Sequence, residues 1–213
     1  GADGPTHAGS FDTTYLTTLP NFIVMAASDE AELVRMINTS TNINDRPCAF
    51  RYPRGTGLGS SLPSINEKIE IGKSKIIKEG KKLAILNFGA RLNETLKAAE
   101  NLLKKGIKIT VVDARFAKPL DENLIWQLAT THEAIMTIEE GSIGGFGSHV
   151  VDFLTKKGLM DSSLKFRSLT LPDIFIDQDA PDKMYKIANL DFNSIEEKIL
   201  DLLNSNIVLK KQN

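Results

Sequence analysis

Arg54 is the residue whose setting in this chain most favours ligand chemistry. It lies between Pro53, which restricts the backbone, and Gly55, which lets a ligand approach closely. The apolar run before it predicts a strand, and open α/β sheets bind ligands beyond the carboxyl ends of their strands. A guanidinium at this point can hold a phosphate by two hydrogen bonds, or it can pair with a carboxylate at a domain interface. We expect Arg51 on the opposite face of the strand and rank it well below Arg54.

His7 is one of 3 histidines and lies in a loop rich in glycine and proline. Such a loop can hold an imidazole beside a cavity, and the ordinary pKa of histidine suits proton transfer or hydrogen bonding near neutral pH. An exposed or capping role is the alternative for a lone loop histidine. Asp3 precedes it in the same loop and is a candidate polar anchor, or an Asx-turn residue that stabilises the loop.

The glycine-rich run 141–148 invites comparison with phosphate-binding loops. It lacks the lysine and spacing of a P-loop, and it does not match the dinucleotide fingerprint. We therefore interpret it as a tight turn from a strand into a helix. His132 and His149 are expected to be structural, and no Cys, His and Asp cluster has the spacing of metal ligands.

These residues need a scaffold, and the apolar pattern predicts an α/β fold. In the first block, residues 1–55, a strand at 21–26 leads to a helix capped by Ser28 and then to a strand at 48–52, giving a parallel strand–helix–strand unit. Residues 56–75 are rich in glycine and serine and are predicted to be a linker with too little apolar surface to pack against a core.

The second block, residues 76–213, alternates predicted strands and helices. A hairpin is expected around Glu79-Gly80, followed by strands at 83–88, 107–112, 134–138 and 166–171. The helix predicted between the strands 83–88 and 107–112 carries an apolar stripe at Leu92, Leu96, Ala99 and Leu103. A final helix at about 195–203 is expected to begin with a capping box from Asn193 to Glu196. The pattern predicts a mostly parallel sheet covered on both faces.

Bulk composition narrows the class of protein. The net charge is −1, so the sequence gives no electrostatic case for nucleic acid or an anionic membrane. The single cysteine, Cys48, is interpreted as a buried strand residue and fits a reducing, cytoplasmic setting. No apolar run is long enough to span a bilayer, and no signal peptide is visible, although a targeting segment on a longer precursor stays open.

The chain resembles the 1-deoxy-D-xylulose-5-phosphate synthase family along essentially its whole length. The motifs are Asp-Gly-Pro-Thr-His at 3–7 and Tyr-Pro-Arg-Gly at 52–55, followed by segments 82–89, 113–121 and 171–176. One departure is Ala8, where the family usually has histidine or glutamine. Transketolases and pyruvate dehydrogenase β-subunits share the domain pair, but the first two motifs favour the synthase.

The resemblance implies an α/β fold with an incomplete pyrimidine-binding domain followed by a complete transketolase C-terminal domain. It also implies a thiamine-diphosphate-dependent transferase that uses Mg²⁺ and condenses pyruvate with D-glyceraldehyde 3-phosphate, for isoprenoid and thiamine biosynthesis. By the same resemblance, Arg54 binds the phosphate of the aldehyde acceptor, while Asp3 and His7 face the thiamine and the substrate hydroxyls. His7 is the candidate catalytic residue.

The resemblance further implies that the groups holding the cofactor and metal lie mostly outside these 213 residues. We therefore expect a C-terminal part of the enzyme that is inactive alone, forms a homodimer and works with an N-terminal portion of the same protein. Two alternatives stay open: a non-catalytic dimerisation module, and a β-type subunit of a 2-oxoacid dehydrogenase that requires an α partner.

Overall fold

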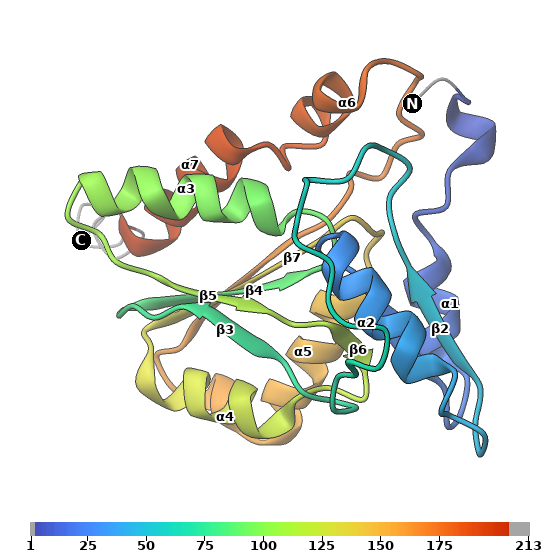
Figure 1. Ribbon diagram of the computed structural model, residues 1–213. Coiled ribbons are helices and arrows are strands. Elements are labelled where there is room, and N and C mark those ends of the chain that lie inside the picture. Colours follow the sequence, from blue (N-terminus) through green and yellow to red (C-terminus); the bar gives the residue numbers. More distant parts are fainter. Residues whose placement is uncertain (1–2, 205–213) are drawn as a thin grey trace.

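The computed structural model describes residues 3–204, which form two sheets and their covering helices (Figure 1). The first block contains a 3-10 turn (Pro5–His7), α1 (Asp12–Thr18), β1 (Ile23–Ala26), α2 (Glu30–Ser40) and β2 (Cys48–Arg51). After it come β3 (Lys75–Lys78), β4 (Leu83–Phe88), α3 (Leu92–Lys104), β5 (Thr110–Asp113), β6 (Phe116–Lys118), α4 (Glu122–Thr131) and β7 (Ala134–Glu139). The last described elements are α5 (Phe146–Lys156), a 3-10 turn (Leu159–Asp161), β8 (Lys165–Leu169), α6 (Pro181–Ile187) and α7 (Phe192–Asn204).

The five-stranded sheet has the strand order β3-β5-β4-β7-β8, and all its pairs are parallel except β3 with β5. The mostly parallel α/β fold predicted from the sequence is therefore confirmed. Helices α3 and α7 cover one face and α4 and α5 the other (Figure 1). The central strands β4 and β7 are buried along their whole length, as expected for strands covered on both faces.

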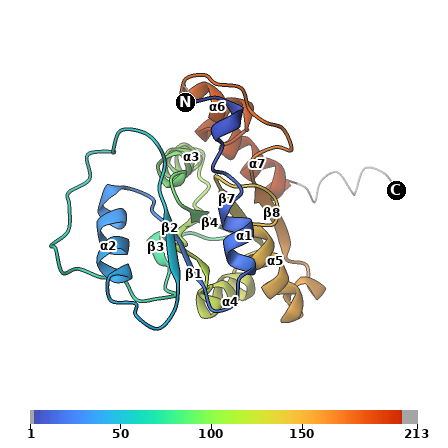
Figure 2. The ribbon, with the colours of Figure 1, turned by 90° about the vertical axis from the view of Figure 1, so that its right-hand side faces the viewer.

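The three-stranded sheet has the order β2-β1-β6. Strands β1 and β2 are parallel, as predicted, and α2 and α1 lie on opposite sides of them (Figure 2). Strand β6 was not anticipated: it comes from the second block and pairs antiparallel with β1. Val24 and Ala26 of β1 also belong to the same apolar cluster as β4 and β5, so the two blocks share part of one core.

Several local predictions were wrong. No hairpin forms around Gly80, because β5 lies between β3 and β4. The N-cap of α2 is Asp29, which accepts a hydrogen bond from the Glu32 amide at 2.7 Å. Ser28 is instead buried, and its hydroxyl donates to Asp113.

The apolar stripe predicted for α3 is confirmed at Ala99, Leu92 and Leu96, which belong to the core or pack against it, but it is wrong at Leu103. Its buried positions are Thr95, Ala98, Ala99 and Leu102, whereas Leu103 is exposed. At the start of α7, Asp191 accepts hydrogen bonds from the amides of Asn193 and Ser194, so Asp191 caps this helix in place of the expected capping box.

The connecting segment packs along α2 more closely than its composition suggests. Ile69 is buried in the core of the first block, and its amide donates to Thr39 Oγ1 at 2.9 Å. The Glu30 carboxylate accepts the amides of three consecutive residues, 58–60. Too little apolar surface was therefore the wrong reading, since a single isoleucine and a set of helix-to-loop hydrogen bonds hold the segment in place.

Candidate functional site

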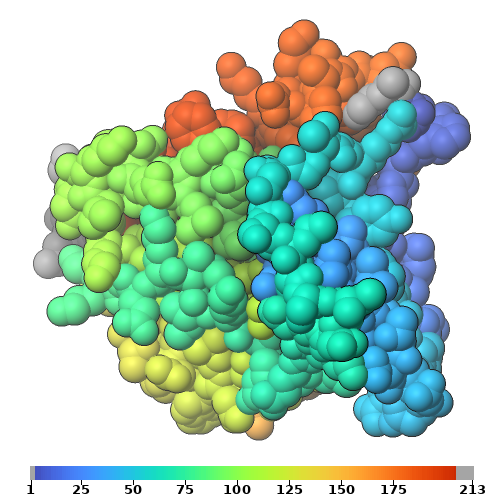
Figure 3. Space-filling model, viewed as in Figure 1, coloured from blue at the N-terminus to red at the C-terminus, as the bar shows by residue number. Residues whose placement is uncertain are grey.

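A cavity of about 380 Å³ lies where the two blocks meet. Its walls come from the opening loop (residues 3–11), the residues after β1 and β2, the turn after β4, the residues after β7, and the segment 171–185. The opening loop, the segment after β2 and the segment containing α6 come together at the upper right of the molecule in Figure 3. Because β1, β2, β4 and β7 all end here, the site occupies the edge at which open α/β sheets bind ligands.

The cavity is lined by all three residues singled out in the sequence, Asp3, His7 and Arg54. Arg54 forms an ion pair with Asp3. A carboxylate was the alternative partner predicted for Arg54 from the sequence, and this carboxylate belongs to another candidate site residue. The Arg54 side chain is 70% exposed and that of Asp3 is 49% exposed. An ion pair this open to water contributes only about 0–1 kcal/mol, so an incoming anion can exchange with it.

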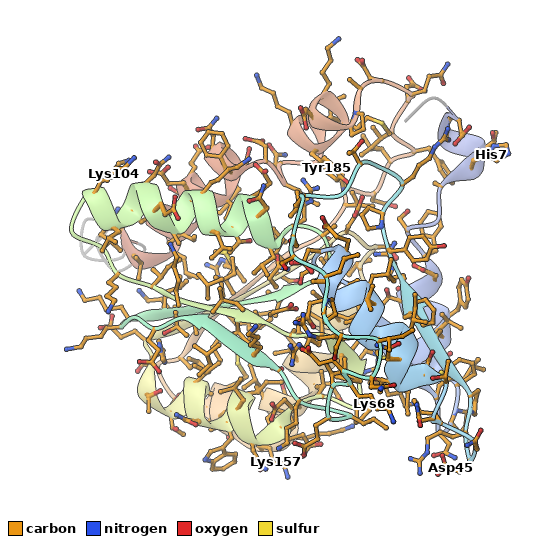
Figure 4. The ribbon with its side chains drawn as sticks, viewed as in Figure 1. His7, Asp45, Lys68, Lys104, Lys157 and Tyr185 are labelled. Carbon is orange, nitrogen blue, oxygen red and sulfur yellow. The ribbon has the colours of Figure 1, made fainter. Side chains whose placement is uncertain are left out.

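His7 lies in the 3-10 turn at the rim of the cavity and is exposed, at the outer edge of the molecule in Figure 4. Its Nδ1 lies 3.0 Å from Thr6 Oγ1, a hydrogen bond that can fix the ring tautomer. Asp3 pairs with Arg54, so it does not orient His7 by an ion pair in this arrangement. Ala8 also lines the cavity, where it adds no hydrogen-bonding side chain.

Arg51 lines the same cavity as Arg54, so the expectation that it faces away was wrong. Its Nη1 donates to the Glu140 carbonyl at 2.7 Å and its Nε to Asp12 Oδ2 at 3.0 Å. A longer bond of 3.4 Å joins its Nη2 to the Gly9 carbonyl. The strand alternation that placed Arg51 on the other face does not extend past the end of β2, where the chain turns.

Tyr185 on α6 was missed because this short helix was not predicted. Its hydroxyl donates to the Glu140 carboxylate, and the Arg91 guanidinium lies 3.3 Å from the centre of its ring. Burial, and then the negative charge of Glu140, raise the pKa of the Tyr185 phenol. Pro181 at the first helical position and Asp182 in the first turn are the signals that could have indicated the helix.

The glycine-rich run forms the strand-to-helix turn that we predicted. The Glu139 carboxylate accepts the amides of Phe146 and Gly147 at the start of α5, at 2.9 and 2.8 Å. A Cβ on Gly145 would lie 2.3 Å from Glu139 Oε2, and one on Gly147 would lie 2.3 Å from Ser168 Oγ. These glycines therefore allow close packing inside the protein, and the amides at the helix start are already occupied.

Other candidate chemistry in residues 3–204 is structural. His132 bonds Thr110 Oγ1 through Nε2 at 2.8 Å, and burial lowers its pKa. Burial also lowers the pKa of His149, and burial raises that of the Cys48 thiol on β2. Within these residues, no three His, Cys, Asp or Glu side chains are grouped closely enough to hold a metal ion. Over the same range, no helix combines the length and apolar character needed to cross a bilayer.

Two family descriptions match the chain. The family "Transketolase, C-terminal domain" matches residues 72–195, and "Transketolase, pyrimidine binding domain" matches residues 1–57. A solved structure described as a split gene transketolase, inactive β4 tetramer, superposes with a TM-score of 0.81 at 25% sequence identity. The match covers 94% of this chain and 64% of that one, so the present chain spans less than two thirds of the length of its structural relative.

Proposed function

This chain belongs to the transketolase family, and from that premise we propose that it supplies the acceptor-binding part of a 1-deoxy-D-xylulose-5-phosphate synthase. The intact enzyme would condense pyruvate with D-glyceraldehyde 3-phosphate, with loss of carbon dioxide, for isoprenoid and thiamine biosynthesis. The observation that carries the proposal is the convergence of Asp3, His7 and Arg54 on one cavity, since they come from two separate segments of the chain. The two motifs that hold these residues favour the synthase over other members of the family.

Arg54 is the proposed phosphate-binding residue. Its exposed guanidinium is free to turn from the weak pair with Asp3 towards a phosphate, which can accept two parallel hydrogen bonds. The released Asp3 carboxylate would then be available to an acceptor hydroxyl. The Arg54 guanidinium would thus be paired with Asp3 before binding and with the phosphate after binding.

His7 is the proposed catalytic residue, placed to hydrogen-bond a substrate oxygen or to transfer a proton to it. The Thr6 hydroxyl engages Nδ1, so Nε2 is the nitrogen proposed to meet the substrate. Because His7 is exposed at the rim, we propose that a ligand entering the cavity passes beside it.

Thiamine diphosphate and Mg²⁺ are the proposed cofactors of the intact enzyme, in which the thiamine would supply the carbanion chemistry. The residues described here do not fit the metal, because none of their acidic and imidazole side chains are grouped as a ligand set. We propose that groups outside these 213 residues hold the cofactor and metal, on another portion of the same protein. The chain alone would then bind an acceptor without turnover.

Binding of D-glyceraldehyde 3-phosphate to the chain, measured by isothermal titration calorimetry, tests the proposal. Arg54→Gln should weaken this binding at least about tenfold, because a lost charged hydrogen-bond pair is worth about 1.5–3 kcal/mol. Arg46→Gln is the matched control, since Arg46 is exposed and pairs only with the adjacent Asp45 among the described residues. Equal affinities for Arg54→Gln and the unaltered chain would refute the assignment of Arg54.

An assay with pyruvate, D-glyceraldehyde 3-phosphate, thiamine diphosphate and Mg²⁺ tests the proposal that the chain alone has no turnover. We expect no 1-deoxy-D-xylulose 5-phosphate from the chain alone. Product formed by a sample whose intact mass is 23.4 kDa would overturn the proposed division of the site between this chain and another portion.

A second candidate is a non-catalytic module that associates with itself. The structural relative is described as an inactive β4 tetramer, and this chain exposes Tyr15 on α1, Leu19 just after α1 and Ile143 in the neighbouring glycine-rich turn. The same observation agrees with a homodimer of the synthase or with a β-type subunit that needs a separate partner chain. Analytical ultracentrifugation should find a dimer or larger species. A stable monomer at micromolar concentration would count against the self-associating module and against the homodimer.

A further inference from the structure

Arg51 joins three segments that are far apart in the sequence. It is the last residue of β2, and its guanidinium bonds the Gly9 carbonyl of the opening loop, the Asp12 carboxylate at the start of α1 and the Glu140 carbonyl after β7. The Arg51–Asp12 pair is shielded, with side-chain exposures of 22% and 23%. The guanidinium therefore holds the opening loop against the end of the second block.

Glu140 also connects Arg51 to the opposite wall of the cavity. The carbonyl of Glu140 accepts from Arg51 while its carboxylate accepts from Tyr185 on α6. Tyr185 is held in turn by the guanidinium of Arg91 over its ring. In Figure 4, the labelled His7 lies on the opening loop and the labelled Tyr185 on α6. The position of the loop and the position of α6 are thus fixed to one residue.

We propose that Arg51 is a positioning residue that fixes the opening loop over the cavity and so presents Asp3 and His7 to the ligand. The identity of that ligand, an aldehyde bearing a phosphate, rests on the proposed function. Arg51 would not touch the ligand itself, because each of its guanidinium nitrogens already bonds the protein. Among the described residues, by contrast, the exposed Asp3 carboxylate is the only ionic partner of Arg54, so Arg54 remains available to bind.

The planar fork of arginine suits this role and the single ammonium of lysine does not. Three acceptors in three directions match the separate nitrogens of a guanidinium, whereas an ammonium on a flexible chain cannot reach all of them at once. Arg51→Lys keeps the positive charge and the strand position, so it removes the geometry while leaving the electrostatics near Asp12 largely unchanged. Arg46→Lys is the matched control on an exposed arginine outside the cavity.

Nuclear magnetic resonance of the chain tests the proposal without requiring turnover. In Arg51→Lys, the His7 imidazole resonances should shift, and the Ser142 amide, which donates to the Ser10 carbonyl of the opening loop at 3.0 Å, should exchange at least about tenfold faster, while amides of β4 and β7 stay unchanged. Arg46→Lys should alter neither. Unchanged His7 resonances and Ser142 exchange in Arg51→Lys would overturn the proposal, as would faster exchange throughout the core.

Ligand titrations separate positioning from phosphate binding. Arg51→Lys should weaken the binding of D-glyceraldehyde 3-phosphate by about fivefold or more. The binding of inorganic phosphate should be unaffected, because Arg54 is intact. Equal losses for both ligands would contradict a role confined to the loop. If Arg51→Lys does not fold, Asp12→Ala removes one acceptor of Arg51 and should give the same changes in smaller degree. If the unaltered chain binds no acceptor, the proposed function fails, while the resonance and exchange data still decide the role of Arg51.

Discussion

The two sheets of this protein are stabilised in different ways. In the five-stranded sheet, β4 and β7 are completely buried between two helical layers, and apolar contacts account for their packing. In the three-stranded sheet, β2 is only half-buried, and β1 completes its pairing with β6 from the second block. The three-stranded sheet thus depends on its neighbour for a strand and part of its core, whereas the five-stranded sheet takes all its strands from its own block.

Charged residues also join the two blocks beside the small sheet. Glu32 on α2 pairs with Arg115 at 2.8 Å and with Arg35 at 3.0 Å, and Ser28 donates to the buried Asp113 at 2.6 Å. Asp113 is the last residue of β5, and Arg115 lies in the turn from β5 to β6. Buried charges of this kind give little net stability when intact but cost much when one partner is lost. The small sheet should therefore respond to changes in charge, and the large sheet to changes in volume.

Phe88 in β4 should give the largest effect. Its side chain is fully buried and stacks on Phe146 with ring centres 5.1 Å apart. Phe88→Ala should lower the free energy of unfolding by about 3–5 kcal/mol through lost burial and a cavity. Phe50→Ala in the half-buried β2 is the paired comparison and should cost less than about 2 kcal/mol. Equal losses in urea denaturation would show that the two sheets do not differ as described.

Arg115 tests the charged connection. The Arg115 and Glu32 side chains are 13% and 6% exposed, so Arg115→Met leaves a buried carboxylate with Arg35 alone. The expected loss is about 3 kcal/mol. Adding Glu32→Leu should restore part of that loss in the same denaturation experiment. A double variant less stable than Arg115→Met would contradict the view that an unpaired charge is the cause.

Asp113 should give a moderate effect that depends on pH. Burial raises its pKa from 3.8 to about 7, opposed by Ser28 and Arg115 and reinforced by the nearby Glu32. The folded state therefore keeps a proton that the unfolded chain has released, and stability should fall as pH rises from about 4 to about 7. The slope from this group reaches at most about 1.4 kcal/mol per pH unit. Asp113→Asn should flatten the dependence of the unfolding midpoint on pH, and an unchanged slope would exclude Asp113 as its source.

Asp3 should have the smallest effect on stability. Its ion pair with Arg54 is exposed, so Asp3→Asn should change the free energy of unfolding by less than about 1 kcal/mol. The same variant should alter acceptor binding, which calorimetry can measure on the folded chain. A large loss of stability would mean that the cavity residues support the fold as strongly as the sheets do.

The apolar pattern was sufficient to predict most of the large sheet, because its strands β4, β5 and β7 are continuous buried runs. It could not predict β6, whose three residues acquire their role only by pairing with β1 across the block boundary. The cavity was predicted in part: Asp3, His7 and Arg54 belong to recognisable motifs, and they meet as expected. Arg51 was placed on the wrong face and Tyr185 was missed, because their partners, Glu140 and Asp12, are set by tertiary contacts that no local pattern encodes.

The short turn from β5 to β6 has a mechanical consequence for the whole molecule. Only residues 114 and 115 separate a strand of the large sheet from a strand of the small one, and Arg115 occupies the left-handed region at a φ of 58°. Because this turn is only two residues long, it constrains the angle between the sheets more directly than the long segment 56–75 does. The longer segment acts as a tether, so a protease cut at its exposed residues 61 and 62 should leave two pieces that remain assembled by strand pairing and a common core.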